Sequence, residues 1–276
     1  MKARLKAAQS AILSLVAAFL LISPVYAQDN SSALNAGYHN VHIGVKDIDE
    51  AIAWYQEHLP MNATQGSPYA SYGGTTIALV KTDTAALPSE GTGINRIGLT
   101  VTDVDATVTK MAASGAKVLV QARDLAGLYR HAIVVDPFGV TIELVEDQGE
   151  PRFHHVYLRS PDPAATLDWY ESLVGGTRGK FKGKIEGLSY AQAQDAGPGT
   201  IWLFIEPSNG KPLAPTADRA IRNIAFGITD TDATVARFNA KGAKHLSGPD
   251  NFRDILIVTF FADPNGVSVE LMDFMQ

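Results

Sequence analysis

The sequence predicts an α+β protein built from four units that each run strand, helix and three further strands. Three observations support this prediction: long segments repeat along the chain, an aspartate precedes each expected helix, and short β-rich runs follow each helix. The chain has 276 residues, of which 46% are hydrophobic and 19% are charged. This is a globular composition with enough apolar material for a core, and the length allows one large domain or two of ordinary size.

The beginning of the chain differs in character from the rest. Three basic residues within the first six precede an uncharged apolar run, 11–22, and Val25 and Ala27 then occupy the −3 and −1 positions of a cleavage site. This layout predicts a signal peptide over 1–27, cleaved after Ala27, and a flexible segment over 28–37. The run is shorter than the about 20 residues of a membrane-spanning helix. We therefore expect a periplasmic or secreted protein with no stable membrane anchor after signal cleavage.

Composition excludes several classes of function. The sequence contains no cysteine, which excludes disulfide frameworks, cysteine-ligated zinc, iron–sulfur clusters and a cysteine nucleophile. The formal net charge is −6 and no basic patch stands out, so we expect no nucleic-acid partner.

Internal repeats organise the chain. The segment 136–144 recurs as 263–271, and 102–108 recurs as 229–235, both shifted by 127 residues. The Trp-Tyr pair at 54–55 also recurs, at 169–170. Repeats of this kind indicate homologous structural units.

The repeats divide the chain into two halves. They predict an N-terminal domain over 38–147, a short polar linker over 148–151 and a C-terminal domain over 152–276. Each half contains two strand–helix openings, so each is expected to hold two units.

The elements follow in the same order in every unit. A strand ends before each of four aspartates, and an aspartate at this position caps the first turn of a helix. The predicted N-caps are Asp47, Asp103, Asp162 and Asp230. The β-rich runs behind the helices include 75–81, 131–135, 200–205 and 255–261.

Alternation along the strands separates an aliphatic face from a polar face. The strand before Asp162 places Val156 opposite His155, and the same alternation predicts that His154 points away from His155. A glutamate in the middle of a strand is costly to bury without a partner, so we expect a groove along the polar face. The polar face predicted in this way carries Asn40, His42, Glu143, His155, Tyr157, Arg159, Asn223 and Glu270.

In these features the chain resembles the vicinal oxygen chelate superfamily, which includes glyoxalase I, extradiol dioxygenases and bleomycin-resistance proteins. The motifs that carry the resemblance are the Trp-Tyr pairs at 54–55 and 169–170 and the closing motif Asp-Pro-x-Gly-x-x-x-Glu-Leu at 136–144 and 263–271. The resemblance implies that βαβββ units pair into cupped sheets around one divalent metal. It also implies that the two halves are two tandem domains of this type.

The resemblance implies where metal ligands would stand: seven residues before the aspartate that opens a unit, and at the glutamate of the closing motif. In the C-terminal half these positions hold His155, Asn223 and Glu270, and Trp202 falls at a further ligand position. The residues do not discriminate among zinc, nickel, manganese and iron. The alternative is a degenerate site in which His155 and Glu270 pair with each other or with Arg159.

The N-terminal half offers a second groove. Asn40, Arg96, Ala78 and Glu143 stand at the corresponding positions. One hypothesis is a rearranged metal site of His42, His131 and Glu143. The other is a salt bridge or carboxylate clamp between Arg96 and Glu143. Residues expected to line a substrate pocket are Tyr157, Arg159, Tyr190 and Trp202.

Three functions follow from the resemblance. The first is an exported, divalent-metal-dependent lyase or isomerase that acts on a small vicinal-oxygen substrate in the C-terminal groove, with no general base identified. The second is a non-catalytic small-molecule-binding protein, similar to bleomycin-resistance proteins. The third is an extradiol-type dioxygenase, although Phe260 stands where those enzymes carry a tyrosine. The partner is a small molecule in each case, and the chain is expected to be a monomer or a homodimer.

Overall fold

The computed structural model describes residues 37–192 and 199–275. The expected signal peptide, 1–27, and all but the last residue of the expected flexible segment lie outside the described residues. Four helices occur in the described part, at positions that the repeat predicts. They are α2 (Ile48–His58), α3 (Val104–Ala113), α4 (Pro163–Leu173) and α5 (Thr231–Ala240). None of these described helices has the length and apolar character needed to cross a membrane.

The predicted helix starts are confirmed. The side chain of each aspartate accepts a hydrogen bond from the backbone N–H three residues later, at distances of 2.8–3.0 Å. The capping residues are Asp47, Asp103, Asp162 and Asp230. The same local signal therefore starts all four units.

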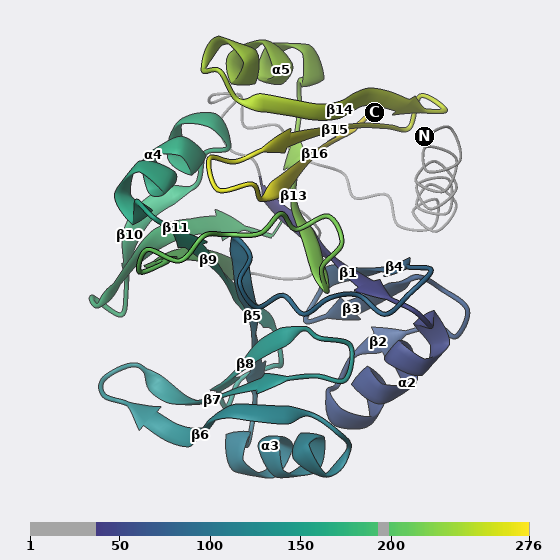
Figure 1. Cartoon of the computed structure of the whole chain (residues 1–276), viewed down its shortest axis with the longest axis vertical. Helices are drawn as coiled ribbons and strands as arrows, with labels where there is room; N and C mark the ends of the chain where they lie inside the picture. The colour runs from purple at the N-terminus through teal and green to yellow at the C-terminus, as the bar shows by residue number, and fades with distance from the viewer. Residues whose placement is uncertain (1–36, 193–198, 276) are drawn as a thin grey trace.

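The strands form two eight-stranded sheets, and the helices lie on the outside of the molecule (Figure 1). The first sheet has the order β14 (Lys244–Phe252), β15 (Leu256–Ala262), β16 (Ser268–Phe274), β13 (Ile221–Ile228), β1 (Gly37–Val45), β4 (Thr75–Lys81), β3 (Tyr69–Tyr72) and β2 (Asn62–Ala63). The second has the order β10 (Thr177–Phe181), β11 (Ile185–Ala191), β12 (Thr200–Pro207), β9 (Phe153–Ser160), β5 (Ile94–Val101), β8 (Thr141–Glu146), β7 (Tyr129–Val135) and β6 (Lys117–Leu125). The predicted α+β class with four βαβββ units is confirmed.

Each sheet combines one unit from each half of the sequence. The first unit joins the fourth through the antiparallel pair β1–β13, and the second joins the third through β5–β9. The polar faces therefore do not belong to an N-terminal and a C-terminal half. The expectation of a groove built within the C-terminal half is wrong for this reason.

Connection lengths explain the pairing. The joint 148–151 is too short to carry the chain to another sheet, so β8 and β9 both flank β5. The longer segments 82–93 and 208–220 each take the chain from one sheet to the other. These two crossing segments run beside each other, with bridges between Leu87 and Arg219 and between Thr92 and Ala214.

Buried tyrosine–aspartate bonds tie the two sheets together. Oη of Tyr55 on α2 donates to Asp136 at 2.5 Å, and Oη of Tyr170 on α4 donates to Asp263 at 3.2 Å. Each tyrosine belongs to the Trp-Tyr motif and each aspartate to the closing motif. The two repeated motifs thus bond to each other within each sequence half, across the sheet boundary.

Candidate functional site

The first candidate site surrounds the carboxylate of Glu143 on β8. Two buried imidazoles and the guanidinium of Arg96, whose side chain is 11% exposed, meet it there, and the group Glu143, Arg96, His131 and His155 is called the Glu143 cluster. Gly98 on β5 pairs in register with His155 on one side and with Glu143 on the other. The register therefore places the two side chains on the same face of the sheet.

Both carboxylate oxygens of Glu143 have close partners. Nδ1 of His131 lies 2.8 Å from Oε1, and Nε of Arg96 donates to Oε2 at 2.6 Å. Nε2 of His155 lies 3.4 Å from Oε2. The cluster thus holds an anion and a cation in direct contact, with two imidazoles beside them.

The guanidinium of Arg96 contacts three side chains. Besides Glu143, its Nη1 donates to Glu206 on β12 at 2.9 Å. Its Cζ lies 3.7 Å from the ring centre of Tyr157 on β9. Two charge-assisted hydrogen bonds and a cation–π contact offset the cost of burying this cation.

These contacts set the ionisation of Glu143. Burial alone would raise the pKa of this carboxyl, but hydrogen bonds from His131 and His155 and the charge of Arg96 outweigh burial and hold the pKa well below its usual range. Burial lowers the pKa of His155. Glu143 is therefore a carboxylate and His155 a neutral imidazole at neutral pH.

The second candidate site surrounds Glu270 on β16 of the first sheet. It contains His42 and Asn40 on β1 and Asn223 on β13, and this group is called the Glu270 cluster. Nδ2 of Asn223 donates to Oε2 of Glu270 at 2.7 Å, and Nε2 of His42 lies 3.2 Å from the same oxygen. Asn40 pairs in register with Ala225, which in turn pairs with Glu270.

The Glu270 cluster lacks the cation that stabilises Glu143. Burial raises the pKa of Glu270 to about 8, and the hydrogen bond from Asn223 lowers it only in part. Burial, followed by the charges of Arg222 and His39, lowers the pKa of His42 to about 3. Oδ1 of Asn40 and Nε2 of His42 are buried without a hydrogen-bond partner among the described residues. Unsatisfied buried atoms of this kind are costly and call for an explanation.

The structure places the predicted metal ligands in two different clusters. His155 lies in the second sheet, whereas Asn223 and Glu270 lie in the first, so the predicted group of these three residues does not form. The rearranged group of His42, His131 and Glu143 is also wrong, because His42 lies beside Glu270. The predicted salt bridge between Arg96 and Glu143 is present.

The position of His154 differs from the prediction. The register of β5 against β9 shifts between Gly98 and Leu99, which is the mark of a β-bulge at His154. The extra residue breaks the alternation, so His154 contacts its neighbour instead of pointing away, and Nδ1 of His154 lies 2.8 Å from Nδ1 of His155. Residues 153–155 include no glycine or proline that would indicate this bulge.

Three of the four predicted substrate-binding residues lie near the Glu143 cluster. Tyr157 lies under Arg96, Arg159 ion-pairs with Glu206 at 2.8 Å, and half-buried Trp202 stacks on Phe204. Tyr190 is different: it is 2% exposed and packs against Phe226 in the core. The prediction for Tyr190 as a substrate-binding residue therefore has no support in its surroundings.

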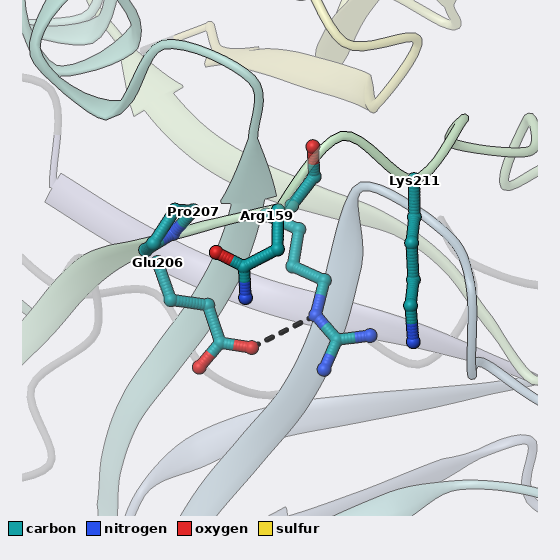
Figure 2. A pocket seen from close by; sticks show the side chains of 6 residues that line it. Arg159, Glu206, Pro207 and Lys211 are labelled. Carbon is teal, nitrogen blue, oxygen red and sulfur yellow. Dashed lines mark hydrogen bonds and ion pairs between the residues drawn. The ribbon is translucent and has the colours of Figure 1, made fainter.

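A cavity of about 250 Å³ opens beside Arg159 (Figure 2). It is lined by Arg159, Glu206, Pro207, Ser208, Asn209 and Lys211. Glu206 joins this cavity to the Glu143 cluster, because one of its oxygens faces Arg159 and the other faces Arg96.

Sequence reasoning missed two members of this neighbourhood. Glu206 shares a strand face with Trp202, so alternation along the run 200–205, extended by one residue, would have indicated it. Tyr129, whose Oη lies 3.4 Å from Oε1 of Glu143, stands two residues before His131 and would follow from the same argument.

One further group in the described part of the chain has the residue types of a metal site. Asp103, Asp105 and Glu146 place ligand oxygens within 4.8 Å of one another. Structural roles already account for them: Asp103 caps α3, Glu146 accepts from the N–H of Val104, and Asp105 pairs with Arg130. This acidic group is exposed or half-buried and is not a candidate site.

The architecture defines the class of fold: paired βαβββ units form each sheet, and each sheet carries a buried glutamate in a closing strand. The family described as the Glyoxalase/Bleomycin resistance protein/Dioxygenase superfamily matches residues 37–144 and 152–271 of the chain. The chain belongs to this superfamily, which confirms the predicted family.

Individual relatives are distant. "Putative glyoxylase CFP32" of Mycobacterium bovis is 24% identical over 71% of this chain and 76% of its own length. Glyoxalase I from Zea mays has a TM-score of 0.64 and 19% identity, covering 86% of this chain and 92% of that one. A "putative dioxygenase" from Bacillus subtilis has a TM-score of 0.58 and 16% identity, covering 88% and 86%. These structures establish the fold.

The superfamily includes metal-dependent members, and the two clusters differ in how well they fit a divalent ion. The Glu143 cluster does not fit, because a guanidinium already contacts the carboxylate and would repel a second cation. The Glu270 cluster fits. It offers a carboxylate, the buried Nε2 of His42 and the buried Oδ1 of Asn40, with no cation on the carboxylate among the described residues.

Proposed function

We propose that the chain is a divalent-metal-dependent lyase or isomerase of the glyoxalase type, and that the Glu270 cluster is its metal site. The observation that carries the proposal is two buried atoms without hydrogen bonds among the described residues, Oδ1 of Asn40 and Nε2 of His42, beside a glutamate with no guanidinium on it. Nε2 of His155 is also without a hydrogen bond, but Arg96 contacts the carboxylate there. A divalent ion held at Glu270 would give the atoms of Asn40 and His42 a partner. It also explains why a carboxyl that is 2% exposed faces an imidazole and amides rather than an arginine.

The residues of this cluster have separate roles in the proposal. Glu270 and His42 would hold the ion, and the amide oxygens of Asn40 and Asn223 would complete the protein ligands. An ion there supplies polarisation of two neighbouring substrate oxygens, which makes an adjacent C–H more acidic. The apolar walls of Phe260 and Met272, which lie on β15 and β16, would keep water from the site.

The test is the metal content of the purified chain beside two glutamate variants. We expect about one zinc, nickel, manganese or iron ion per chain in the wild type and none in Glu270→Gln. Glu146→Gln is the matched control, because it removes one member of the exposed acidic group and leaves the Glu270 cluster intact. We expect the control to keep the full metal content.

Two results would overturn the metal assignment: no bound ion in the wild type after incubation with divalent metals, or full metal content in Glu270→Gln. The reaction type needs its own measurement. The metal-loaded chain is incubated with small α-hydroxycarbonyl compounds in deuterated water, and deuterium incorporation is followed by NMR. Bound metal with no exchange for any compound in the series would reject the lyase or isomerase activity.

The second candidate function is non-catalytic binding of a small molecule. The observation that favours it is the cavity beside Arg159, next to a cluster that contains an arginine in place of a metal ligand. A chain that binds no metal but binds small anionic or aromatic compounds by calorimetry would support this function instead.

We also propose that the chain is exported, on the basis of residues 1–27, and that it acts as a monomer or a homodimer. Export predicts that intact-mass measurement of the protein from the periplasm or medium gives a chain that begins at Gln28. An N-terminus at Met1 would contradict it.

A further inference from the structure

Arg96, a mostly enclosed arginine, lies on the central strand β5 of the second sheet. Arg96 stands seven residues before the aspartate that opens its unit, Asp103, and Asn223 stands at the same place before Asp230. The two positions are related by the repeat, yet one carries a fixed positive charge and the other a neutral amide. The proposed function, which concerns the Glu270 cluster, does not use Arg96.

The geometry shows what the guanidinium does there. Its Nε lies 2.6 Å from Oε2 of Glu143, and Nε2 of His155 lies 3.4 Å from the same oxygen. His131 reaches the other oxygen at 2.8 Å. Two imidazoles and a carboxylate, residue types that suit a transition metal, therefore lie beside the guanidinium, although their ligand atoms do not all lie within 4.8 Å of one another.

The arginine is also fixed in place. It bonds to Glu206 at 2.9 Å and lies over the ring of Tyr157, and its side chain is 11% exposed. An incoming divalent ion would have to displace a cation that has two carboxylate partners and an aromatic partner. Two cations in this space would also repel each other strongly at low effective dielectric.

We infer that Arg96 takes the place of the metal ion in the Glu143 cluster, and that this one residue keeps the cluster metal-free. His131, His155 and Glu143 are then a latent set of ligands, whose atoms must move closer together to hold an ion once Arg96 is replaced. Arg96 supplies the positive charge beside Glu143, whereas no described residue places a guanidinium or ammonium group on Glu270.

The test measures metal binding after Arg96 is replaced. All variants carry Glu146→Gln and Glu270→Gln, which remove the exposed acidic group and the Glu270 cluster as competing sites. We expect this background to bind no Co²⁺ or Zn²⁺, and the addition of Arg96→His to create binding of about one ion per chain. Co²⁺ gives a second readout that does not depend on activity, because its visible absorption reports the coordination number and ligand field of the bound ion.

Two further variants make the result specific. Arg159→His adds a histidine in the same background next to Glu206 but away from Glu143, and we expect it to bind no ion. Arg96→Met keeps a long side chain for packing on Tyr157 without the charge, and we expect it to bind the ion more weakly than Arg96→His.

Metal binding by the background itself, if abolished by His155→Ala, would overturn the inference, since Arg96 is intact in it. Folded Arg96→His and Arg96→Met variants that bind no ion would also overturn it. The background measurement requires no change at Arg96, so it decides the question even where a variant at Arg96 does not fold. None of these outcomes depends on whether wild-type protein holds metal at Glu270, so failure of this inference and failure of the proposed function are distinguishable.

Discussion

Glu143 and Glu270 occupy equivalent places in the two sheets, and their surroundings give them opposite properties. Both stand in the closing motif of a unit, 127 residues apart, and they are 1% and 2% exposed. Burial acts to raise both pKa values. It prevails at Glu270, whose pKa rises to about 8, whereas imidazole hydrogen bonds and Arg96 hold the pKa of Glu143 well below its usual range.

This comparison teaches that the neighbouring side chain, and not the fold, decides what each glutamate can do. The backbone register is the same around both residues, because each pairs with a small residue on the adjacent central strand, Gly98 or Ala225. Arg96 in place of Asn223, together with the imidazoles of His131 and His155, replaces a pKa of about 8 at Glu270 with a pKa well below the usual range at Glu143. One fold thus supplies two different chemical environments in one chain.

The largest expected difference between the two glutamates is the loss of folding stability when each is replaced by glutamine. Glu143→Gln leaves the buried guanidinium of Arg96 without its closest counter-charge, and breaking a buried pair in this way costs about 3–5 kcal/mol. Glu270→Gln replaces a carboxyl that is already mostly protonated at pH 7 by a group of the same shape, so we expect a change of less than about 1 kcal/mol. The measurement is the free energy of unfolding in denaturant at pH 7 with a chelator present. Equal losses in the two variants would show that the clusters do not differ as described.

The buried aspartate that begins each closing motif, Asp136 or Asp263, gives the next prediction. Burial raises the pKa of Asp136 to about 7, even though Tyr55 and backbone N–H groups donate hydrogen bonds to its side chain. The folded chain thus keeps this proton to a higher pH than the unfolded chain does. The contribution of Asp136 to stability is therefore greatest in acid and is lost as the pH rises from about 4 to about 7.

Asp136→Asn removes this pH dependence. We expect the difference in unfolding free energy between wild type and variant to change with pH by up to about 1.4 kcal/mol per unit within that window, and to level off above it. Burial raises the pKa of Asp263 as well, so Asp263→Asn is expected to act in the same direction. A slope of opposite sign in either variant would contradict the assignment of burial as the dominant cause.

The sequence predicts the four βαβββ units correctly, but it does not show which two units pair in each sheet. Caps at Asp47 and Asp162, the closing motifs and the strand alternation are local patterns, and the structure confirms the units that they predict. The repeat shows which positions are equivalent, but it is compatible with pairing within a half as well as with pairing across the halves. Pairing within a half therefore predicts His155 beside Glu270, whereas the structure places it beside Glu143. The short joint 148–151 was the available signal, because few residues between two strands favour neighbours in one sheet.

The smallest expected effect on stability concerns Gly98 and Ala225, the small residues that pair with His155 and Asn40. Gly98 pairs with His155, and a Cβ added at Gly98 would lie 2.2 Å from Cε1 of that ring. In the first sheet the equivalent pair is Ala225 with Asn40, where a shorter side chain leaves space for the methyl group. We expect Gly98→Ala to cost about 1–3 kcal/mol through overpacking and Ala225→Gly to cost about 0.5–1 kcal/mol.

A double variant tests whether these two residues compensate each other. Adding His155→Asn to Gly98→Ala recreates in the second sheet the small-residue and amide pair of the first, so we expect it to recover part of the stability that Gly98→Ala loses. The measurement is a double-mutant cycle on the unfolding free energy, in which a favourable coupling of about 0.5–3 kcal/mol is expected for residues in contact. Strict additivity would mean that the glycine is not required by the imidazole. The difference between the two clusters would then begin at Arg96 and Asn223 alone.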